Sequence, residues 1–245
     1  MYKESFLMAW ASLIANKLRS LLTMLGIIIG VAAVIALVSI GNGVKQDIED
    51  SISSLGSNLL VVLPGAPRTP GARSSQGSMK SLKISDYEAI AKLEGVKAAS
   101  PMTNGSYVVI YQNKNWTTSV AGVNSNFQDV NNWTMTSGRF FSDKNVQNRE
   151  RVAVVGQTVV KNLFTDEDPV GKEIRVKNIP FRVIGVLKSK GNGTMGNDQD
   201  DTVLIPYTTS MERVEGIDYL RRVYVVAKDD GGIDRLQADI ENLLR

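Results

Sequence analysis

Two residue types are absent from this chain of 245 residues, which contains no histidine and no cysteine. Without histidine, the Ser-His-Asp and Cys-His arrangements of nucleophilic enzymes and the usual zinc ligand sets are excluded. Without cysteine there are no disulfides, so a domain outside the cytoplasm must be held together by its own apolar core. We therefore expect no catalytic residues, no metal site and no bound cofactor.

A large excess of charge is also absent, since 28 basic and 25 acidic residues leave a net charge of +3. No basic run is interleaved with aromatic residues, so the pattern of a nucleic-acid-binding protein is missing. Hydrophobic residues make up 43% of the chain, and its length allows one or two small folded units. The composition predicts an ordinary globular part and no nucleic-acid partner.

One long apolar run is present. Twelve of the twenty residues from Leu21 to Ile40 are Leu, Ile or Val, and no charged residue falls between Arg19 and Lys45. A helix of about 20 residues is about 30 Å long, which matches the hydrocarbon core of a bilayer. A buried helix of a soluble protein rarely runs this long without a polar face, and a cleaved signal would have a shorter apolar region. The pattern predicts an uncleaved transmembrane helix over residues 21–43.

The residues before the span indicate its orientation. Residues 1–20 place Trp10 and several aliphatic residues at helical spacing, which predicts an amphipathic helix in the membrane interface. Lys3, Lys17 and Arg19 precede the span against a single acidic residue, whereas acidic residues gather after it. Because positive residues stay on the cytoplasmic side, we expect the N-terminus inside and the long remainder outside.

Small residues form a stripe along the predicted span. Gly26 and Gly30 make a GxxxG spacing that Ala33 continues, and small residues let a second helix approach closely within a membrane. We interpret these three residues as a helix-packing face.

Beyond Gly43, apolar residues recur every three or four positions, which predicts that the helix continues as a stalk over residues 44–57. The apolar seam of this stalk consists of Val44, Ile48, Ile52 and Leu55.

The remaining pattern predicts an α+β fold. Residues 58–63 and 96–102 are predicted as strands on either side of a helix, which a capping box at Ser85–Glu88 opens. From residue 106 to 205 strand patterns predominate. The chain then returns to a strand and an amphipathic helix over Ile233–Leu244.

Two loop motifs have tempting alternatives. Gly191 to Gly196 match the GxGxxG spacing of dinucleotide sites, but such a site needs a helix next, and here acidic residues and a strand follow. We interpret this segment as a hairpin loop. Asp198, Asp200 and Asp201 lack the spacing and the distal glutamate of an EF-hand, so we interpret them as part of a solvated loop rather than a Ca²⁺ site.

Several blocks along the chain resemble one family. They are the GIIIGVAAVIALVSIGNG helix and the segments LGSNLLVVLPG, NWTTSVAGVN, RVAVVGQTVVKNLF, DEDPVGKEIRVKNIPFRVIGVL and QDDTVLIP. Over nearly its whole length the chain resembles the permease subunit of macrolide-exporter-type (MacB-like) ABC transporters. The resemblance covers the first membrane helix and the extracytoplasmic core domain of that subunit.

The resemblance implies a division of the outer part into two lobes. A porter-like βαβ lobe would comprise residues 58–105 and 206–245. A β-rich lobe, residues 106–205, would be inserted between those two segments. One N-terminal transmembrane helix with its stalk would precede both lobes.

The resemblance also implies a function. The chain would be part of a homodimeric permease in a bacterial cytoplasmic (inner) membrane, and a separate cytoplasmic ABC ATPase would bind it, since the chain has no Walker A sequence. ATP-driven movement would reach the outer domain by mechanotransmission, for efflux or export of drug, peptide or lipid-like substrates. A membrane-fusion adaptor protein is an optional further partner. The alternative that the residues leave open is a single-pass membrane-anchored extracytoplasmic sensor or binding domain.

Overall fold

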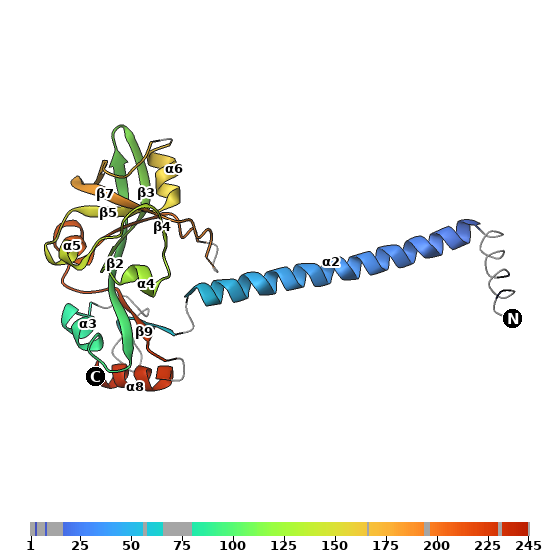
Figure 1. Ribbon diagram of the computed structural model, residues 1–245, viewed down its shortest axis with the longest axis horizontal. Coiled ribbons are helices and arrows are strands. Elements are labelled where there is room, and N and C mark those ends of the chain that lie inside the picture. Colours follow the sequence, from blue (N-terminus) through green and yellow to red (C-terminus); the bar gives the residue numbers. More distant parts are fainter. Residues whose placement is uncertain are drawn as a thin grey trace, which may run out of the picture. The chain divides into compact units, whose positions relative to one another are not determined.

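A computed structural model of the chain describes residues 3, 8, 17–55, 58–65, 80–165, 167–193, 197–229 and 232–244. Within the helix, the side chains of residues 20, 23, 40 and 42–55 lie outside this description. The chain divides into two compact units, Met1–Asp50 and Ser51–Arg245. Figure 1 labels the helix of the first unit and most helices and strands of the second.

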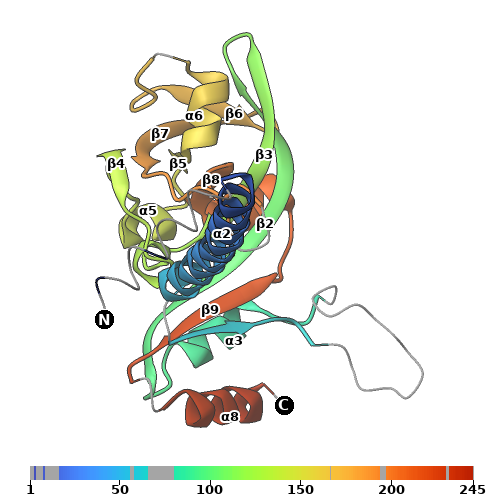
Figure 2. The same cartoon turned by 90° about the vertical axis from the view of Figure 1, so that its right-hand side faces the viewer.

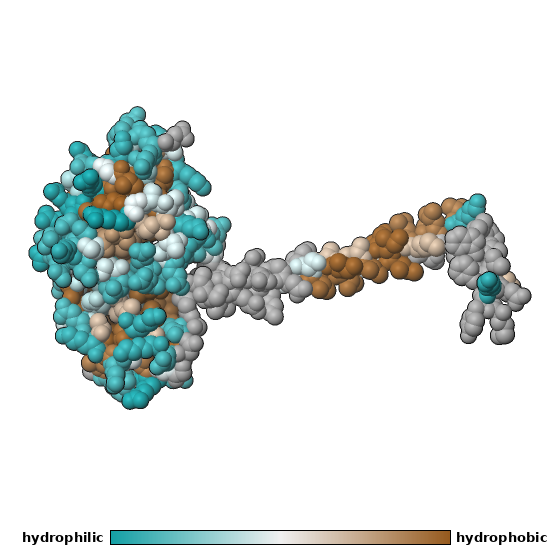
Figure 3. Space-filling view, viewed as in Figure 1, coloured by the Kyte–Doolittle hydropathy of each residue, from teal (hydrophilic) through white to brown (hydrophobic). Residues whose placement is uncertain are grey.

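A single long helix, α2, runs from Lys17 to Leu55. Its segment Lys17–Ser39 is the one helix among the described residues that is long and apolar enough to cross a membrane. The described side chains of this segment are exposed, and Ile27 and Leu37 have 66% and 77% of their surface accessible. Figure 3 shows them as a continuous hydrophobic surface. The structure confirms a helix here, which continues without a break through the glycines at positions 41 and 43. That this helix crosses a membrane stays a prediction. Most of the predicted interfacial helix, residues 1–20, lies outside the described residues.

Three antiparallel strands form the first sheet of the second unit, in the order β1-β9-β2. One face of this sheet is apolar, since alternate residues of β9 (Val223, Val225 and Ala227) are buried there. Two helices, α3 and α8, contribute Ile90, Leu236 and other side chains to the same core. Figure 2 shows both helices beside this sheet. The bounds of these elements are β1 Leu59–Val62, β2 Val96–Tyr111, β9 Arg222–Ala227, α3 Ile84–Ile90 and α8 Ile233–Leu243.

The second sheet begins with the other half of β2 and is mixed. β3 pairs parallel with β8, and β5 pairs parallel with β7, whereas the remaining pairs are antiparallel. All four residues of β5 are buried, because helix α6 covers one face of this sheet and helices α4 and α5 cover the other. The bounds are β3 Lys114–Val123, β4 Met135–Gly138, β5 Val152–Val155, β6 Glu173–Val176, β7 Ile179–Leu187, β8 Thr202–Pro206, α4 Phe127–Val130, α5 Asp143–Gln147 and α6 Gln157–Leu163.

Strand β2 belongs to both sheets. The sequence predicted two separate strands here, but the structure has one strand of 16 residues that continues through Gly105. A Cβ on Gly105 would be 2.7 Å from the ring of Tyr107. The ring can therefore occupy this position because residue 105 has no side chain. The uninterrupted strand is the main covalent and hydrogen-bonded link between the two sheets.

The chain leaves β8 through two short helical segments. Helix α7 (Tyr207–Thr209) continues directly into the π-helix η1 (Ser210–Glu215). Gly216 ends η1 in the left-handed conformation, with φ of +66°, where glycine is favoured because it has no Cβ. The sequence pattern predicts a helix from Pro206 to Val214, and the structure confirms it, but the pattern does not predict the π geometry.

The predicted helix after the first strand is confirmed, but its cap is different. The sequence placed a capping box at Ser85 with Glu88 three residues later. In the structure the cap lies two residues earlier, because Lys83 is the N-cap and α3 begins at Ile84. The backbone N–H of Lys83 donates to the carboxylate of Asp86 at 2.7 Å, so Asp86 satisfies one of the unpaired donors at the helix start.

This cap predicts different effects for two neighbouring substitutions. Asp86→Ala should lower the free energy of unfolding by about 0.5–2 kcal/mol, since it removes a cap hydrogen bond. Ser85→Ala serves as the matched control and should change it by less than about 0.5 kcal/mol, because Ser85 is exposed. Urea unfolding of the two variants checks this. An equal or larger loss in Ser85→Ala would show that the cap is at Ser85.

Candidate functional site

A carboxylate after the Gly191–Gly196 loop fixes the backbone just after β7, where the loop begins. Asp200 is buried, and its carboxylate accepts hydrogen bonds from the backbone N–H groups of Lys190 (2.8 Å) and Gly191 (3.1 Å) and from the Ser189 hydroxyl. The interpretation of this cluster as a solvated loop was therefore wrong for Asp200, because its side chain is buried. A buried carboxylate without these donors would lower stability.

Its two acidic neighbours also have protein partners. Asp198 accepts the hydroxyl of Thr158 at 2.6 Å, and Asp201 accepts the indole N–H of Trp116 at 2.8 Å. Among the described residues no group of three acidic side chains is placed to hold a metal ion. Strand β8 follows the loop, as predicted, where a dinucleotide site would need a helix.

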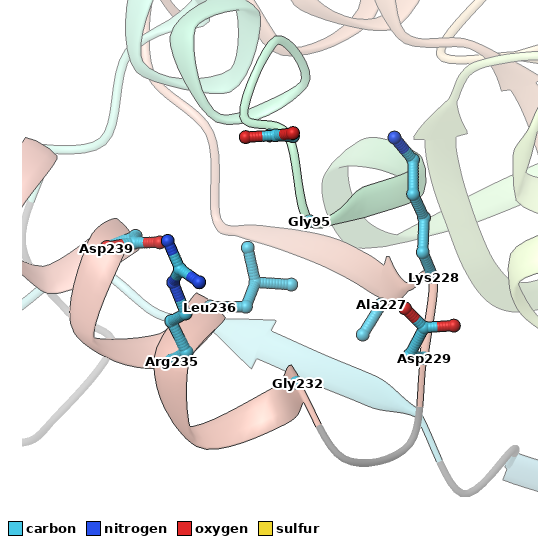
Figure 4. A pocket seen from close by; sticks show the side chains of 9 residues that line it. Gly95, Ala227, Lys228, Asp229, Gly232, Arg235, Leu236 and Asp239 are labelled. Carbon is cyan, nitrogen blue, oxygen red and sulfur yellow. The ribbon is translucent and has the colours of Figure 1, made fainter.

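A charged cleft of about 360 Å³ lies between the start of α8 and the end of β9. Figure 4 shows Lys228 and Asp229 on one side of it and Arg235 and Asp239 on the other. The floor includes Gly95 and the buried Leu236. Three acidic residues (Glu94, Asp229 and Asp239) and two basic ones (Lys228 and Arg235) line this cleft, so charges of both signs are mixed there.

The joint between the two sheets has a polar core. Thr103 of β2 and Ser210 of η1 are fully buried, and their hydroxyls share a hydrogen bond of 2.8 Å. Gly122 of β3 lies against both. A Cβ at this position would be 2.4 Å from the Cβ of Ser210 and 2.6 Å from the hydroxyl of Thr103. This close approach packs β2, β3 and η1 against one another without free space.

A buried carboxylate completes this joint. The side chain of Glu215 is 2% exposed, accepts a hydrogen bond from the Ser210 hydroxyl at 3.1 Å and lies 3.6 Å from the guanidinium of Arg221. Burial raises the pKa of the neighbouring Tyr107 phenol, and the Glu215 carboxylate raises it further. We call these residues (Thr103, Gly122, Ser210, Glu215 and Arg221) the polar joint.

The polar joint has no signature in the sequence. A threonine in a strand and a serine before a helix occur on most protein surfaces, and no spacing relates positions 103, 122 and 210. One weak signal was the glycine inside a strand pattern at position 122, which often marks a close approach of another part of the chain.

The predicted helix-packing residues lie on the exposed part of α2. Gly26, Gly30 and Ala33 are exposed, and no atom lies within 4 Å of a Cβ built on either glycine. The predicted stalk seam (Val44, Ile48, Ile52 and Leu55) falls within α2, but its side chains lie outside the described part of the chain. Both assignments remain predictions.

The tip of the β2–β3 hairpin is tied to the loop after α6. The Tyr111 hydroxyl donates to the carboxylate of Glu167 at 2.8 Å, and the Lys172 ammonium lies 3.4 Å from the same carboxylate. The hydrogen bond from Tyr111 lowers the pKa of Glu167, and Lys172 lowers it further. This tie holds the hairpin against the second sheet.

The close packing at Gly122 gives a first prediction for this site. Gly122→Ala should lower the free energy of unfolding by about 1–3 kcal/mol, because an added methyl group overlaps Ser210 and Thr103. Gly65→Ala, where no atom lies within 4 Å of the added Cβ, is the matched control. Chemical denaturation measures both. Equal stability of the two variants would mean that the joint has room to relax.

The tie at Glu167 gives a pH prediction. Because its pKa is lowered in the folded state, the stabilisation by Glu167 is present above the usual glutamate pKa of about 4.3 and is lost as the pH falls through the lowered value. The Tm difference between wild type and Glu167→Gln should be constant near neutral pH and should close on acidification. Glu173→Gln, also exposed, controls for general charge effects. A difference that grows on acidification would contradict the tie.

Comparison with known proteins places these features in context. A family model described as the MacB-like periplasmic core domain matches residues 20–243. The chain is 45% identical over 246 residues to the macrolide export ATP-binding/permease protein MacB of Rhodospirillum rubrum, covering 100% of this chain and 37% of that protein. It is 39% identical to the protein of the same name from Chlorobium luteolum, covering 96% of this chain and 36% of that protein. The chain thus spans little more than a third of the length of these relatives.

Solved structures have the same fold. The periplasmic region of MacB from Actinobacillus actinomycetemcomitans aligns with a TM-score of 0.68 at 26% identity, over 79% of this chain and 85% of that one. The extracellular domain of the transporter YknZ from Gram-positive bacteria aligns with a TM-score of 0.64 at 20% identity, over 76% of this chain and 92% of that one. The second likeness concerns the fold alone.

Proposed function

Because this chain belongs to the MacB-like periplasmic core domain family of ABC transporter permeases, we propose that it is the N-terminal part of a macrolide-exporter-type permease. The observation that carries this proposal is the family match over residues 20–243, which includes both the apolar helix and the folded domain. In this proposal the chain itself is not catalytic, and a separate cytoplasmic ABC ATPase hydrolyses ATP.

The mechanism that we propose is mechanotransmission. ATP-driven closure of the ATPase moves the membrane helices, and the outer domain responds to that movement. Helix α2 supports this idea because it continues for 39 residues from the apolar segment to the start of the folded domain. An unbroken helix transmits a displacement along its axis, whereas a flexible linker would absorb it. Export of drug, peptide or lipid-like substrates would follow from movement of the outer domain.

We also propose that the outer domain is built from two lobes. The porter-like lobe comprises residues 58–105 and 206–245, and the inserted lobe comprises residues 106–205. Two observations support this division. Leu82, Ile90 and the inner residues of β9 form one hydrophobic cluster, while α6 and the second sheet form another. The polar joint lies where the chain passes from one lobe to the other, at residues 103 and 210.

The partners of this chain in the proposal are a second copy of itself, the ATPase and the bilayer. Lys17 and Arg19 support an N-terminus on the cytoplasmic side of the inner membrane, with the main domain outside. An adaptor protein outside the membrane is a further candidate partner. The dimer contact within the membrane is assigned to Gly26, Gly30 and Ala33, and the stalk contact to Val44, Ile48, Ile52 and Leu55.

Co-purification from the native membrane tests the transporter proposal. The natural gene product, tagged and extracted in several mild detergents, should bring down a nucleotide-binding ABC ATPase that mass spectrometry identifies. ATP hydrolysis should accompany the complex and should be absent from this chain alone. If no ATPase is recovered in any detergent, the chain would be better explained as a membrane-anchored sensor.

Substitution of Gly30 tests the packing face separately. Gly30→Leu should weaken contacts between membrane helices, because a large side chain prevents close approach of the backbones. Ala32→Leu adds a side chain of the same size on nearly the opposite face of the same helix and is the matched control. Crosslinking between helices in membranes measures the contact, and circular dichroism checks that the outer domain is folded. Unchanged crosslinking in Gly30→Leu would refute the packing role.

A further inference from the structure

Strand β1 has one open edge in the described structure. It pairs with β9 on one side, and among the described strands none lies on its other side. Figure 2 shows β1 as the cyan strand on the side of β9 away from β2. An open edge presents backbone N–H and C=O groups that a further strand can bind.

The hydrogen bonds to β9 show which backbone groups face this edge. The Ala227 N–H donates to the Asn58 carbonyl at 2.9 Å, so positions 58 and 227 form a hydrogen-bonded pair. Such pairs alternate along an antiparallel ladder. Leu60 therefore directs its backbone groups toward β9, whereas Leu59 and Val61 direct theirs toward the open edge.

The edge carries no feature that would prevent strand addition. Residues 59 to 63 have the sequence LLVVL, without charge or proline, and the β1–β9 pairing has no bulge. Val61 and Leu63 are 45% and 43% exposed. Proteins usually protect an edge with charges, proline or bulges, so this unprotected apolar edge is typical of a strand that is covered in the assembled protein.

We propose that β1 pairs antiparallel with β1 of a second copy of this chain, around a twofold axis at Val61. In this register Val61 lies opposite Val61 of the partner subunit, Leu59 opposite the partner's Leu63, and Leu60 opposite the partner's Val62. All of these pairs are apolar, so no like charges oppose each other. The edge-facing backbone groups of positions 59, 61 and 63 bond to the same groups in the other copy. The contact is isologous, as a twofold axis requires.

The length of the connection to α2 favours a second copy over an unrelated strand. Only three residues, 56–58, separate the end of α2 from the start of β1, and a chain spans at most about 3.5 Å per residue. Helices packed through the proposed stalk seam, which reaches Leu55 at the end of α2, would lie about 8–10 Å apart there. Two paired α2 helices would thus hold two β1 strands within reach, at a high effective concentration. This step rests on the homodimer of the proposed function.

A single introduced cysteine tests the pairing, because the chain has none of its own. In Val61→Cys the two Cα atoms across the axis would be about 5.5 Å apart, which is within the range of a disulfide. We expect mild oxidation of the full Val61→Cys chain in nanodiscs to give a covalent dimer at least about tenfold faster than oxidation of the control variant does, since the pairing holds both thiols at this distance. The matched control is Val108→Cys, which is 48% exposed on β2, an interior strand.

A second reporter separates this inference from the dimer itself. Leu37→Cys, two turns after Gly30 on the same face of α2, reports the packing of the membrane helices without enlarging a packing residue. If Leu37→Cys crosslinks and Val61→Cys reacts no faster than Val108→Cys, the dimer stands and the β1 pairing is wrong. If neither Leu37→Cys nor Val61→Cys crosslinks, the homodimer of the proposed function fails as well. Fast crosslinking of Val61→Cys, with Val108→Cys slow, supports the pairing.

Discussion

The close approach of three chain segments at Gly122 is the constraint on which the outer domain depends. Strand β3 can lie against Thr103 of β2 and Ser210 of η1 only because residue 122 has no side chain. The hydroxyls of Thr103 and Ser210 then bond to each other, and the buried Glu215 is satisfied by Ser210 and Arg221. Buried polar groups that are fully paired specify one arrangement, since each alternative would leave a group unpaired. This contact therefore holds the two sheets in one relative position.

This joint gives the transport proposal a physical basis. A displacement along α2 is useful outside the membrane only if the domain that receives it does not deform. The continuous strand β2 links both sheets, and the polar joint braces it from one side. The tie between Tyr111 and Glu167 holds the far end of the hairpin. In the proposed mechanism the domain moves as one body, and substrate or partner proteins respond to that movement.

The sequence predicted those features that depend on local pattern. The apolar helix and the final amphipathic helix follow from composition and 3.6-residue periodicity, and both are confirmed. The sequence also predicts a turn at Asn178, because asparagine tolerates positive φ, and Asn178 has φ of +66° between β6 and β7. Strand β2 was predicted as two strands, because the sequence Asn104-Gly105 resembles a turn. In the structure the ring of Tyr107 packs against Gly105 and the strand continues. The polar joint could not be predicted, because Ser210 lies 88 positions from Gly122 and 107 positions from Thr103, and such separations leave no periodic signal. The role of Asp200 could not be predicted either, because its donors are backbone groups of a loop.

The distance between the two sheets during the transport cycle is the most direct test of this account. Spin labels at Asn113→Cys, on the tip of the β2–β3 hairpin, and at Lys228→Cys, at the end of β9, report on the two sheets of one protomer. The labelled chain is assembled with excess unlabelled chain and the ATPase partner, so that only distances within a protomer are measured. The account predicts one narrow distance distribution that is the same without nucleotide and with ATP. A second distance, or a shift on ATP binding, would show that the joint is a hinge and would contradict the account.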